Sequence, residues 1–347
     1  MRKVIIWLLT LLFLNGCTNE TEVNKIKDSK KQDIEKIRVK INKTKVEKIA
    51  KDEVNQNDKL RQKNEKRDPN KFFAHRGLLN FAPENTLLSF EIAKERGFKN
   101  IELDIVTTKD NKIVVFHDEN LKRMFKIDRD VCKVNYEELL KLKPSQYFFE
   151  VLLGLSKEQI EVIRSVDDPW VKQIDSQKIS LLSDIFKVFG KDFMYHLDIK
   201  TLGCNEELDE DLVFLIEKYG LEDNVLIEST NLGLLERIIA ISPNLKTIYW
   251  NEKVFSFTDE EWQDLQNKGI DSVDLRYSNI HIDKALQVKS QIKNIKFHTY
   301  TVNSLKEIEG LKNYVDYIIT DLDILRNNLD KLQFFNQKSQ KVNLSLP

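Results

Sequence analysis

Short runs of β-branched and aromatic residues alternate with longer amphipathic stretches from residue 72 to about residue 320. The short runs are typical of buried strands, and the longer stretches carry apolar positions at helical spacing. We expect strands over 72–75, 100–105, 113–117, 193–199, 224–229, 246–250, 272–275, 295–302 and 315–320. We expect helices over 85–96, 181–189, 209–219, 231–241, 259–267, 281–291 and 304–311. Repeated strand–helix units favour a parallel sheet, and of the parallel α/β folds a (β/α)8 TIM barrel fits best.

The pattern departs from a regular barrel near the second and third expected strands. Residues 106–112 are too few for a crossover helix, which needs a dozen or more residues, so the expected strands exceed the eight places of a barrel. Residues 119–178 resemble an insertion after the third strand, with one helix near 136–142. The chain has no Gly-x-Gly-x-x-Gly or Walker loop, which argues against a doubly wound nucleotide-binding fold.

The N-terminus has the layout of an export signal. A charged start precedes an apolar run over residues 4–14, which is too short to span a membrane. The following Leu-Asn-Gly-Cys resembles a bacterial lipoprotein cleavage box, in which Cys17 becomes the diacylated first residue of the mature protein. Two acyl chains give stable attachment to a membrane. We expect residues 1–16 to be a lipoprotein signal peptide and the protein to be anchored in the membrane outside the cytoplasm; an ordinary signal peptide with an incidental Cys17 is the alternative.

Charge divides the remaining chain into a tether and a folded part. Residues 18–69 carry 16 basic and 11 acidic residues with no glycine or aromatic residue, so this stretch cannot build a core. We interpret residues 17–69 as the lipidated cysteine and a charged tether, 70–330 as the barrel domain and 331–347 as a C-terminal tail. Residues 70–347 carry 37 basic and 45 acidic residues, which argues against nucleic-acid binding.

The three cysteines are too few for a disulfide framework and have no Cys-x-x-Cys metal spacing. We expect Cys132 and Cys204 to be unpaired, because the first lies in the insertion and the second follows the fourth strand.

Polar residues lie where the expected strands end, the end of a TIM barrel that carries active sites. Glu102 and Asp104 are two apart on one strand, so both carboxylates face the same side and can meet one hard cation. Asp198 can supply a third oxygen ligand, and an all-carboxylate set suits Mg²⁺ or Ca²⁺ better than zinc.

Two histidines and two cations accompany these carboxylates. His75 and His117 are each expected to end a strand, and imidazole can both accept and donate a proton near neutral pH. Arg76 and Lys200 are suited to hold an anionic group. Together these residues indicate hydrolysis or transfer of a phosphodiester. The other histidines, at 196, 281 and 298, lack such neighbours, and we interpret them as packing or surface residues.

Motifs in the same order make the chain resemble the glycerophosphodiester phosphodiesterase family over nearly all of residues 71–325. They are Ala74-His75-Arg76-Gly77, Pro83-Glu84-Asn85-Thr86, Glu102-x-Asp104-Ile105, Thr108-x-Asp110, Val114-Val115-Phe116-His117-Asp118, Asp198-Ile199-Lys200, Glu228-Ser229, Thr301-Val302-Asn303 and Ile318-Ile319-Thr320-Asp321. The resemblance implies a TIM barrel with an inserted segment that releases sn-glycerol 3-phosphate and an alcohol from deacylated phospholipids.

The resemblance also implies roles for individual residues. Glu102, Asp104 and Asp198 would hold a divalent cation, although Asp198 stands where the family usually has the longer Glu. His75 and His117 would be the general acid–base pair. Arg76 and Lys200 would hold the phosphate, and we include Glu84 among the substrate-binding residues. For Asn85-Thr86, capping of the following helix is at least as good an interpretation as ligand contact.

Two alternatives remain open. A phospholipase of the same barrel superfamily, acting on intact phosphoinositide or sphingomyelin, would also use paired histidines, and a membrane tether would bring intact lipid within reach. A surface lipoprotein with a degenerate site would keep the barrel as a binding module; the residues at 75, 102, 104 and 117 argue against this, and Asp198 argues mildly for it. The sequence does not indicate an oligomeric state.

Overall fold

The computed structural model describes residues 67–325 except 166, 201–204, 206, 281 and 293, and it does not describe the side chains of 282–284, 290 and 291. The expected signal peptide, Cys17, all but the end of the tether, Cys204, His281 and the tail at 331–347 lie outside the described residues. Within the described part of the chain, no helix combines the length and apolarity needed to cross a membrane.

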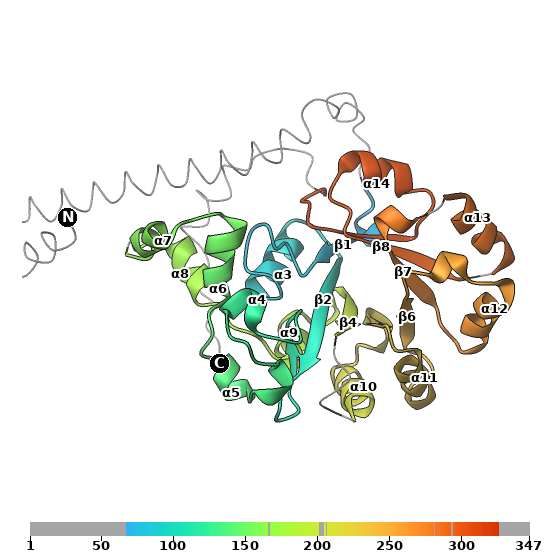
Figure 1. Cartoon of the computed structure of the whole chain (residues 1–347), viewed down its shortest axis with the longest axis horizontal. Coiled ribbons are helices and arrows are strands. Elements are labelled where there is room, and N and C mark those ends of the chain that lie inside the picture. The colour runs from blue at the N-terminus through green and yellow to red at the C-terminus, as the bar shows by residue number, and fades with distance from the viewer. Residues whose placement is uncertain are drawn as a thin grey trace, which may run out of the picture.

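Eight parallel strands form a closed barrel, which confirms the predicted TIM fold (Figure 1). Neighbouring strands pair in the order β1-β9-β8-β7-β6-β5-β4-β2, and the pairing of β1 with β2 closes the ring. The barrel strands are β1 (Phe72–His75), β2 (Asn100–Thr107), β4 (Met194–Ile199), β5 (Val225–Ser229), β6 (Lys246–Trp250), β7 (Ser272–Arg276), β8 (Lys296–Tyr300) and β9 (Tyr317–Thr320).

Seven helices follow the predicted amphipathic stretches, with small shifts at their ends. They are α3 (Leu87–Glu95), α9 (Leu182–Phe189), α10 (Leu208–Tyr219), α11 (Leu232–Ile241), α12 (Asp259–Asn267), α13 (Ile282–Gln291) and α14 (Leu305–Leu311). Short turns of other helix types are η1 (Pro69–Lys71), η4 (Gly190–Asp192), η5 (Glu222–Asn224), η6 (Val254–Ser256) and η7 (Tyr277–Asn279). Thr86 caps α3 in a capping box with Ser89, as expected from the sequence.

The third predicted strand is not part of the barrel ring. β3 (Ile113–Val115) turns back antiparallel along β2, with Ile105 opposite Val115. Thr108 closes the tight turn, since its backbone N–H donates to Lys112 O at 3.0 Å. A connection this short permits only a hairpin, which explains the predicted irregularity. The expectation that His117 ends a strand is wrong, because β3 already ends at Val115. His117 follows at the level of β2's active-site end, where Phe116 N donates to Asp104 O at 3.0 Å.

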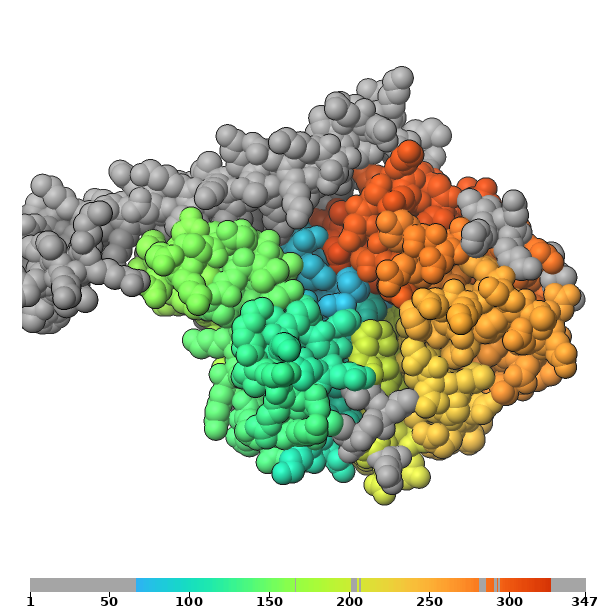
Figure 2. All heavy atoms as spheres, in the orientation of Figure 1, coloured from blue at the N-terminus to red at the C-terminus, as the bar shows by residue number. Residues whose placement is uncertain are grey.

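The insertion between β3 and α9 is a block of short helices, shown in green beside the barrel in Figure 2. It contains α4 (Lys122–Phe125), η2 (Val131–Lys133), α5 (Tyr136–Leu139), α6 (Pro144–Tyr147), η3 (Phe148–Leu152), α7 (Lys157–Arg164) and α8 (Pro169–Asp175). Part of it shares a small core with Val114 and Phe116, built from residues such as Leu121, Met124 and Leu139. The expectation that Cys132 is unpaired is wrong, because it forms a disulfide; its partner is not among the described residues.

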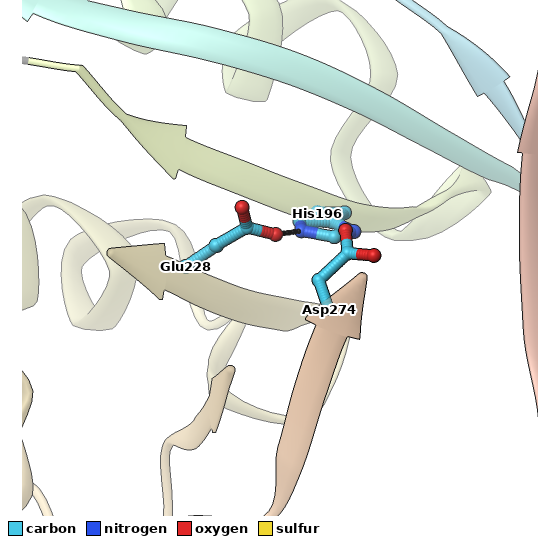
Figure 3. A group of neighbouring side chains, drawn as sticks. All are labelled: His196, Glu228 and Asp274. Carbon is cyan, nitrogen blue, oxygen red and sulfur yellow. Dashed lines mark hydrogen bonds and ion pairs between the residues drawn. The ribbon is translucent and has the colours of Figure 1, made fainter. Parts of the chain in front are cut away.

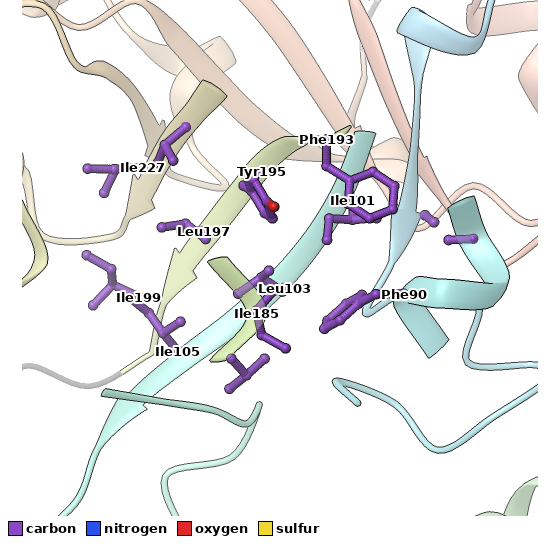
Figure 4. Packing of buried hydrophobic residues seen from close by; sticks show 14 of the residues in the cluster. Phe90, Ile101, Leu103, Ile105, Ile185, Phe193, Tyr195, Leu197, Ile199 and Ile227 are labelled. Carbon is purple, nitrogen blue, oxygen red and sulfur yellow. The ribbon is translucent and has the colours of Figure 1, made fainter. Parts of the chain in front are cut away.

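The main core lies between the barrel wall and the surrounding helices. Apolar residues of β2 and β4, such as Leu103 and Leu197, pack outward against Phe90 of α3 and Ile185 of α9 (Figure 4). Successive side chains of a strand point to opposite faces. The alternate polar residues of the same strands therefore point into the barrel, where the site is found.

Candidate active site

Three carboxylates meet at the active-site end of two neighbouring strands. Glu102 and Asp104 lie on the inner face of β2, and Asp198 of β4 is paired directly with Asp104 across the sheet. One oxygen of each carboxylate lies within 4.8 Å of one oxygen of each of the others. The strand alternation and this register bring together the three residues that the sequence predicted as ligands.

Two cations lie against this group. Arg76 follows β1 directly, and its Nε is 3.2 Å from Asp104 Oδ2. Lys200 follows β4, with its Nζ 3.1 Å from Asp104 Oδ1 and in contact with Asp198. Asn85 adds a neutral contact, since its Nδ2 donates to Asp104 Oδ2 at 2.8 Å. The buried Asp104 is thus the centre of charge compensation in the site.

The tight turn after β1 brings the backbone to the carboxylates. Arg76 has φ of 52° and Gly77 has φ of 76°, a left-handed pair that directs the Arg76 N–H at Glu102 Oε2, 2.9 Å away. A Cβ at Gly77 would stand 2.4 Å from Ser89 Oγ, so a larger residue does not fit without a shift. The His-Arg-Gly motif is therefore needed for the conformation of this turn as well as for the side chains that it supplies.

The three carboxylates differ in how easily they ionise. Burial, followed by the negative charge of Asp104, raises the pKa of Glu102 well above its ordinary value. Burial, followed by the charge of Glu228, raises the pKa of Asp198 to about 7. Burial would also raise the pKa of Asp104, but Arg76 and Lys200 outweigh it and hold that pKa below its usual range.

This charge pattern fits a divalent cation. Three carboxylates against two cationic side chains leave negative charge in excess, and this charge adds to burial in raising the pKa values of Glu102 and Asp198. The donors are all carboxylate oxygens, as hard cations such as Mg²⁺ and Ca²⁺ prefer.

Each predicted acid–base histidine is oriented by its own aspartate. His75 Nδ1 is 2.6 Å from Asp321 Oδ1, and His117 Nδ1 is 2.6 Å from Asp118 Oδ1. A carboxylate at Nδ1 favours the tautomer with the proton on that nitrogen, which leaves Nε2 as the proton acceptor. Hydrogen bonding to His75 helps to keep the pKa of Asp321 below its ordinary value despite burial, which alone would raise it.

The insertion contributes to the site through Arg123. Its Nε donates to Asp118 Oδ2 at 2.6 Å, and its Nη2 donates to Glu84 Oε1 at 2.6 Å. Glu84 is buried, and its Oε1 also accepts from Arg76 at 3.0 Å. Glu84 therefore contacts both Arg76 and Arg123, and these contacts hold the two guanidinium groups in place.

A cavity of about 640 Å³ opens beside these groups. It is lined by His117, Asp118, Glu119, Asn120, Lys122, Arg123 and Lys200. The insertion thus forms one wall of the cavity, and the barrel strand end forms the other.

Sequence reasoning gave no role to three residues that the structure places in the site, which are Asp118, Arg123 and Asp321. Asn85, for which helix capping or ligand contact was expected, donates to Asp104. Asp118 and Asp321 were visible as motif residues, and the position of Asp118 directly after His117 was an available signal. No such signal linked Asp321 to His75, because the two are far apart in the sequence. Arg123 lies in irregular sequence and carried no such signal.

A closed β/α barrel with a carboxylate cluster, two cations and two aspartate-bound imidazoles at its strand ends defines a phosphoric diester hydrolase. Residues 75–322 match the model of the Glycerophosphoryl diester phosphodiesterase family, and the chain belongs to this family.

Individual relatives agree with this assignment. A glycerophosphodiester phosphodiesterase of Caldanaerobacter subterraneus subsp. tengcongensis is 30% identical over 253 residues, covering 72% of this chain and 92% of the relative. One from Bacillus altitudinis is 29% identical over 263 residues, covering 72% and 94%. Among solved structures, an Oleispira antarctica phosphodiesterase in complex with the product sn-glycerol-3-phosphate superimposes with a TM-score of 0.58 at 20% identity, covering 77% of this chain and 97% of that one. This structural likeness supports the barrel fold.

Proposed function

We propose that the protein hydrolyses glycerophosphodiesters to sn-glycerol 3-phosphate and an alcohol, with a divalent cation and His75 and His117 as the acid–base pair. The observation that carries the proposal is the convergence of Glu102, Asp104 and Asp198 next to Arg76 and Lys200. The names of the two bacterial relatives and the product bound to the Oleispira protein support the substrate class.

Different residues of the chain bind the cation and the phosphate. Glu102, Asp104 and Asp198 would hold Mg²⁺ or Ca²⁺, which when bound supplies positive charge that stabilises charge developing on the phosphoryl oxygens. Arg76 and Lys200 hold the phosphate, and Glu84 supports this binding indirectly through its contact with Arg76.

Proton transfer falls to the two imidazoles. Asp321 and Asp118 hold His75 and His117 with Nε2 free. One histidine removes the proton from the nucleophile, and the other protonates the leaving alkoxide. The nucleophile is either water, which gives glycerol 3-phosphate directly, or the adjacent glycerol hydroxyl, which gives a cyclic phosphate that water then opens. Because both are held in the same way, either can begin in either role.

We further propose that the protein acts outside the cytoplasm, attached to the membrane through lipid on Cys17. The disulfide at Cys132 supports this location, because disulfides persist in oxidising compartments. Residues 1–16 would then be removed, and the charged tether would hold the barrel near the membrane. Palmitate labelling of the chain should disappear in a Cys17→Ala variant; label that persists there would refute the anchor.

A coupled assay for glycerol 3-phosphate tests the reaction. Glycerophosphocholine should yield product, EDTA should abolish it, and added Ca²⁺ or Mg²⁺ should restore it. Intact phosphatidylinositol and sphingomyelin in parallel reactions test the phospholipase alternative, and cleavage of these lipids alone would overturn the proposal. Absence of turnover on every substrate, together with absence of cation binding, would favour the degenerate binding module.

A further inference from the structure

A second group of potential metal ligands lies inside the barrel, next to the catalytic carboxylates, since Glu228 is paired with Asp198 across the sheet. His196 of β4, Glu228 of β5 and Asp274 of β7 point toward one another from three strands (Figure 3). One donor atom of each lies within 4.8 Å of the others, and all three residues are buried. His196 Nε2 is 2.5 Å from Glu228 Oε2.

No lysine or arginine in the described part of the chain forms an ion pair with either carboxylate of this group. Glu228 pairs with His196, and Asp274 Oδ1 accepts from the Leu275 N–H at 2.6 Å. Two carboxylates in a dry interior with only an imidazole beside them lack the positive charge that such groups require.

A fourth polar side chain borders the group and has no partner. His298 of β8 is paired with Asp274 across the sheet, and its ring centroid is 5.2 Å from that of His196. His298 is 0% exposed, and neither of its ring nitrogens has a hydrogen-bond partner among the residues that the structure describes. A neutral imidazole carries a lone pair on one of its ring nitrogens, and neither nitrogen of His298 is engaged by a described residue.

Aromatic rings close the space around these groups. Phe73 contacts the rings of both His196 and His298, and Tyr317 lies 4.5 Å from the His298 ring, measured between centroids. A hydrophobic shell of this kind strengthens binding between a cation and its ligands because it excludes water.

We propose that His196, Glu228 and Asp274 bind a divalent transition-metal ion, of which Zn²⁺ and Co²⁺ are representatives. Ligand distances of about 2.0–2.2 Å place donor atoms roughly 3 to 4 Å apart, so small side-chain movements convert the observed group into a coordination sphere. His298, on the neighbouring strand, is the candidate for a further nitrogen ligand. One nitrogen and two carboxylates favour such ions over Mg²⁺ and Ca²⁺, which prefer oxygen.

The two sites can be separated by metal preference. The full-length chain is stripped with EDTA, saturated with Ca²⁺ to fill the all-carboxylate site, and titrated with Co²⁺ by calorimetry and visible absorption. We expect one equivalent of Co²⁺ to bind under Ca²⁺ saturation. Asp274→Asn and His196→Asn should each weaken Co²⁺ binding by at least about tenfold. Asp264→Asn, a matched change at an exposed helix position, should leave it unaltered.

Two further measurements test the interior metal site even if an interior variant fails to fold. Glu102→Gln should weaken Ca²⁺ binding and retain the Co²⁺ equivalent. The wild-type chain loaded with Cu²⁺ under Ca²⁺ saturation should show nitrogen hyperfine coupling from imidazole, and His75→Ala and His117→Ala should retain it. No Co²⁺ bound under Ca²⁺ saturation, or binding that survives both interior changes, overturns the proposal and assigns the group to an internal network of shared protons. Because none of these readouts is turnover, the result is independent of the proposed reaction.

Discussion

The barrel contains two groups of buried acids that differ in what surrounds them. At the strand ends, Asp104 lies between Arg76 and Lys200. In the interior, Glu228 and Asp274 have an imidazole and a ring of aromatic side chains nearby, with no basic side chain paired to them among the described residues. The same residue type is therefore held ionised in one place and driven toward its neutral form in the other. The paired cations of the strand-end group suit a site that holds a phosphate ester beside a metal, whereas the interior carboxylates have no basic side chain paired to them among the described residues.

The catalytic role of the strand-end group is tested most strongly by changes to its two histidines. His75→Ala or His117→Ala should lower kcat by about 10² to 10⁴, because each removes a group that transfers a proton in the rate-determining chemistry. Steady-state kinetics with glycerophosphocholine measures the effect, and Lys268→Ala on a distant helix is the control. Undiminished turnover in both histidine variants would remove the acid–base assignment.

Removing one carboxylate should lower the free energy of unfolding more at the strand ends than in the barrel interior. In the metal-free chain Asp104→Asn leaves Arg76 and Lys200 without their shared partner and should cost up to about 3–5 kcal/mol of unfolding free energy. Asp274→Asn puts an amide of the same shape in place of a carboxyl whose pKa burial raises well above its ordinary value, and should cost less than about 1 kcal/mol. Urea unfolding in EDTA compares the two variants, and equal losses would mean that the difference in environment has no energetic consequence.

The aspartates behind the histidines should have a smaller effect on catalysis. Asp321→Asn or Asp118→Asn keeps the shape but loses a charge-assisted hydrogen bond of about 1.5–3 kcal/mol, so kcat should fall about 10- to 100-fold. Both residues act through an imidazole, and KM should therefore change little. A change confined to KM would show that they act on substrate binding instead.

The smallest expected effect is a pH dependence of stability at Asp198. Its pKa is about 7 in the folded chain against an ordinary 3.8, so between these values the folded state binds more protons than the unfolded state. The free energy of unfolding of the metal-free chain therefore falls as pH rises from about 4 to about 7 because of this residue. Asp198→Asn should flatten that fall by about 1–2 kcal/mol, since coupling to neighbours spreads the titration.

Urea unfolding in EDTA at several pH values measures this difference, with Asp264→Asn as the matched control. If the Asp198→Asn variant keeps the wild-type dependence of unfolding free energy on pH, the pKa of Asp198 is not raised in the folded chain. The strand-end group would then carry less excess negative charge than the structure indicates.

Much of the fold followed from local pattern. The strands over 72–75 and 246–250 were predicted with the bounds that the structure shows, because their apolar runs are flanked by clear polar breaks. The third run was also a strand, and its short connection to the second predicted an irregular barrel, but only the structure showed that it turns back as an antiparallel hairpin. Direction of pairing depends on the path of the chain, which apolar content does not specify.

Composition and alternation along each strand were enough to identify Glu102 and Asp104 as inward neighbours and His75 and His117 as candidates for acid–base chemistry. Tertiary structure alone decided which strand lies beside which, and so it determined that Asp198 meets Asp104 and that Asp321 supports a histidine nearly the whole domain away in sequence. It also turned His196, interpreted from the sequence as an ordinary packing or surface residue, into a member of a buried acidic group. The physical reason is that periodicity fixes the face of a strand on which a side chain lies, whereas register and barrel closure fix its neighbours.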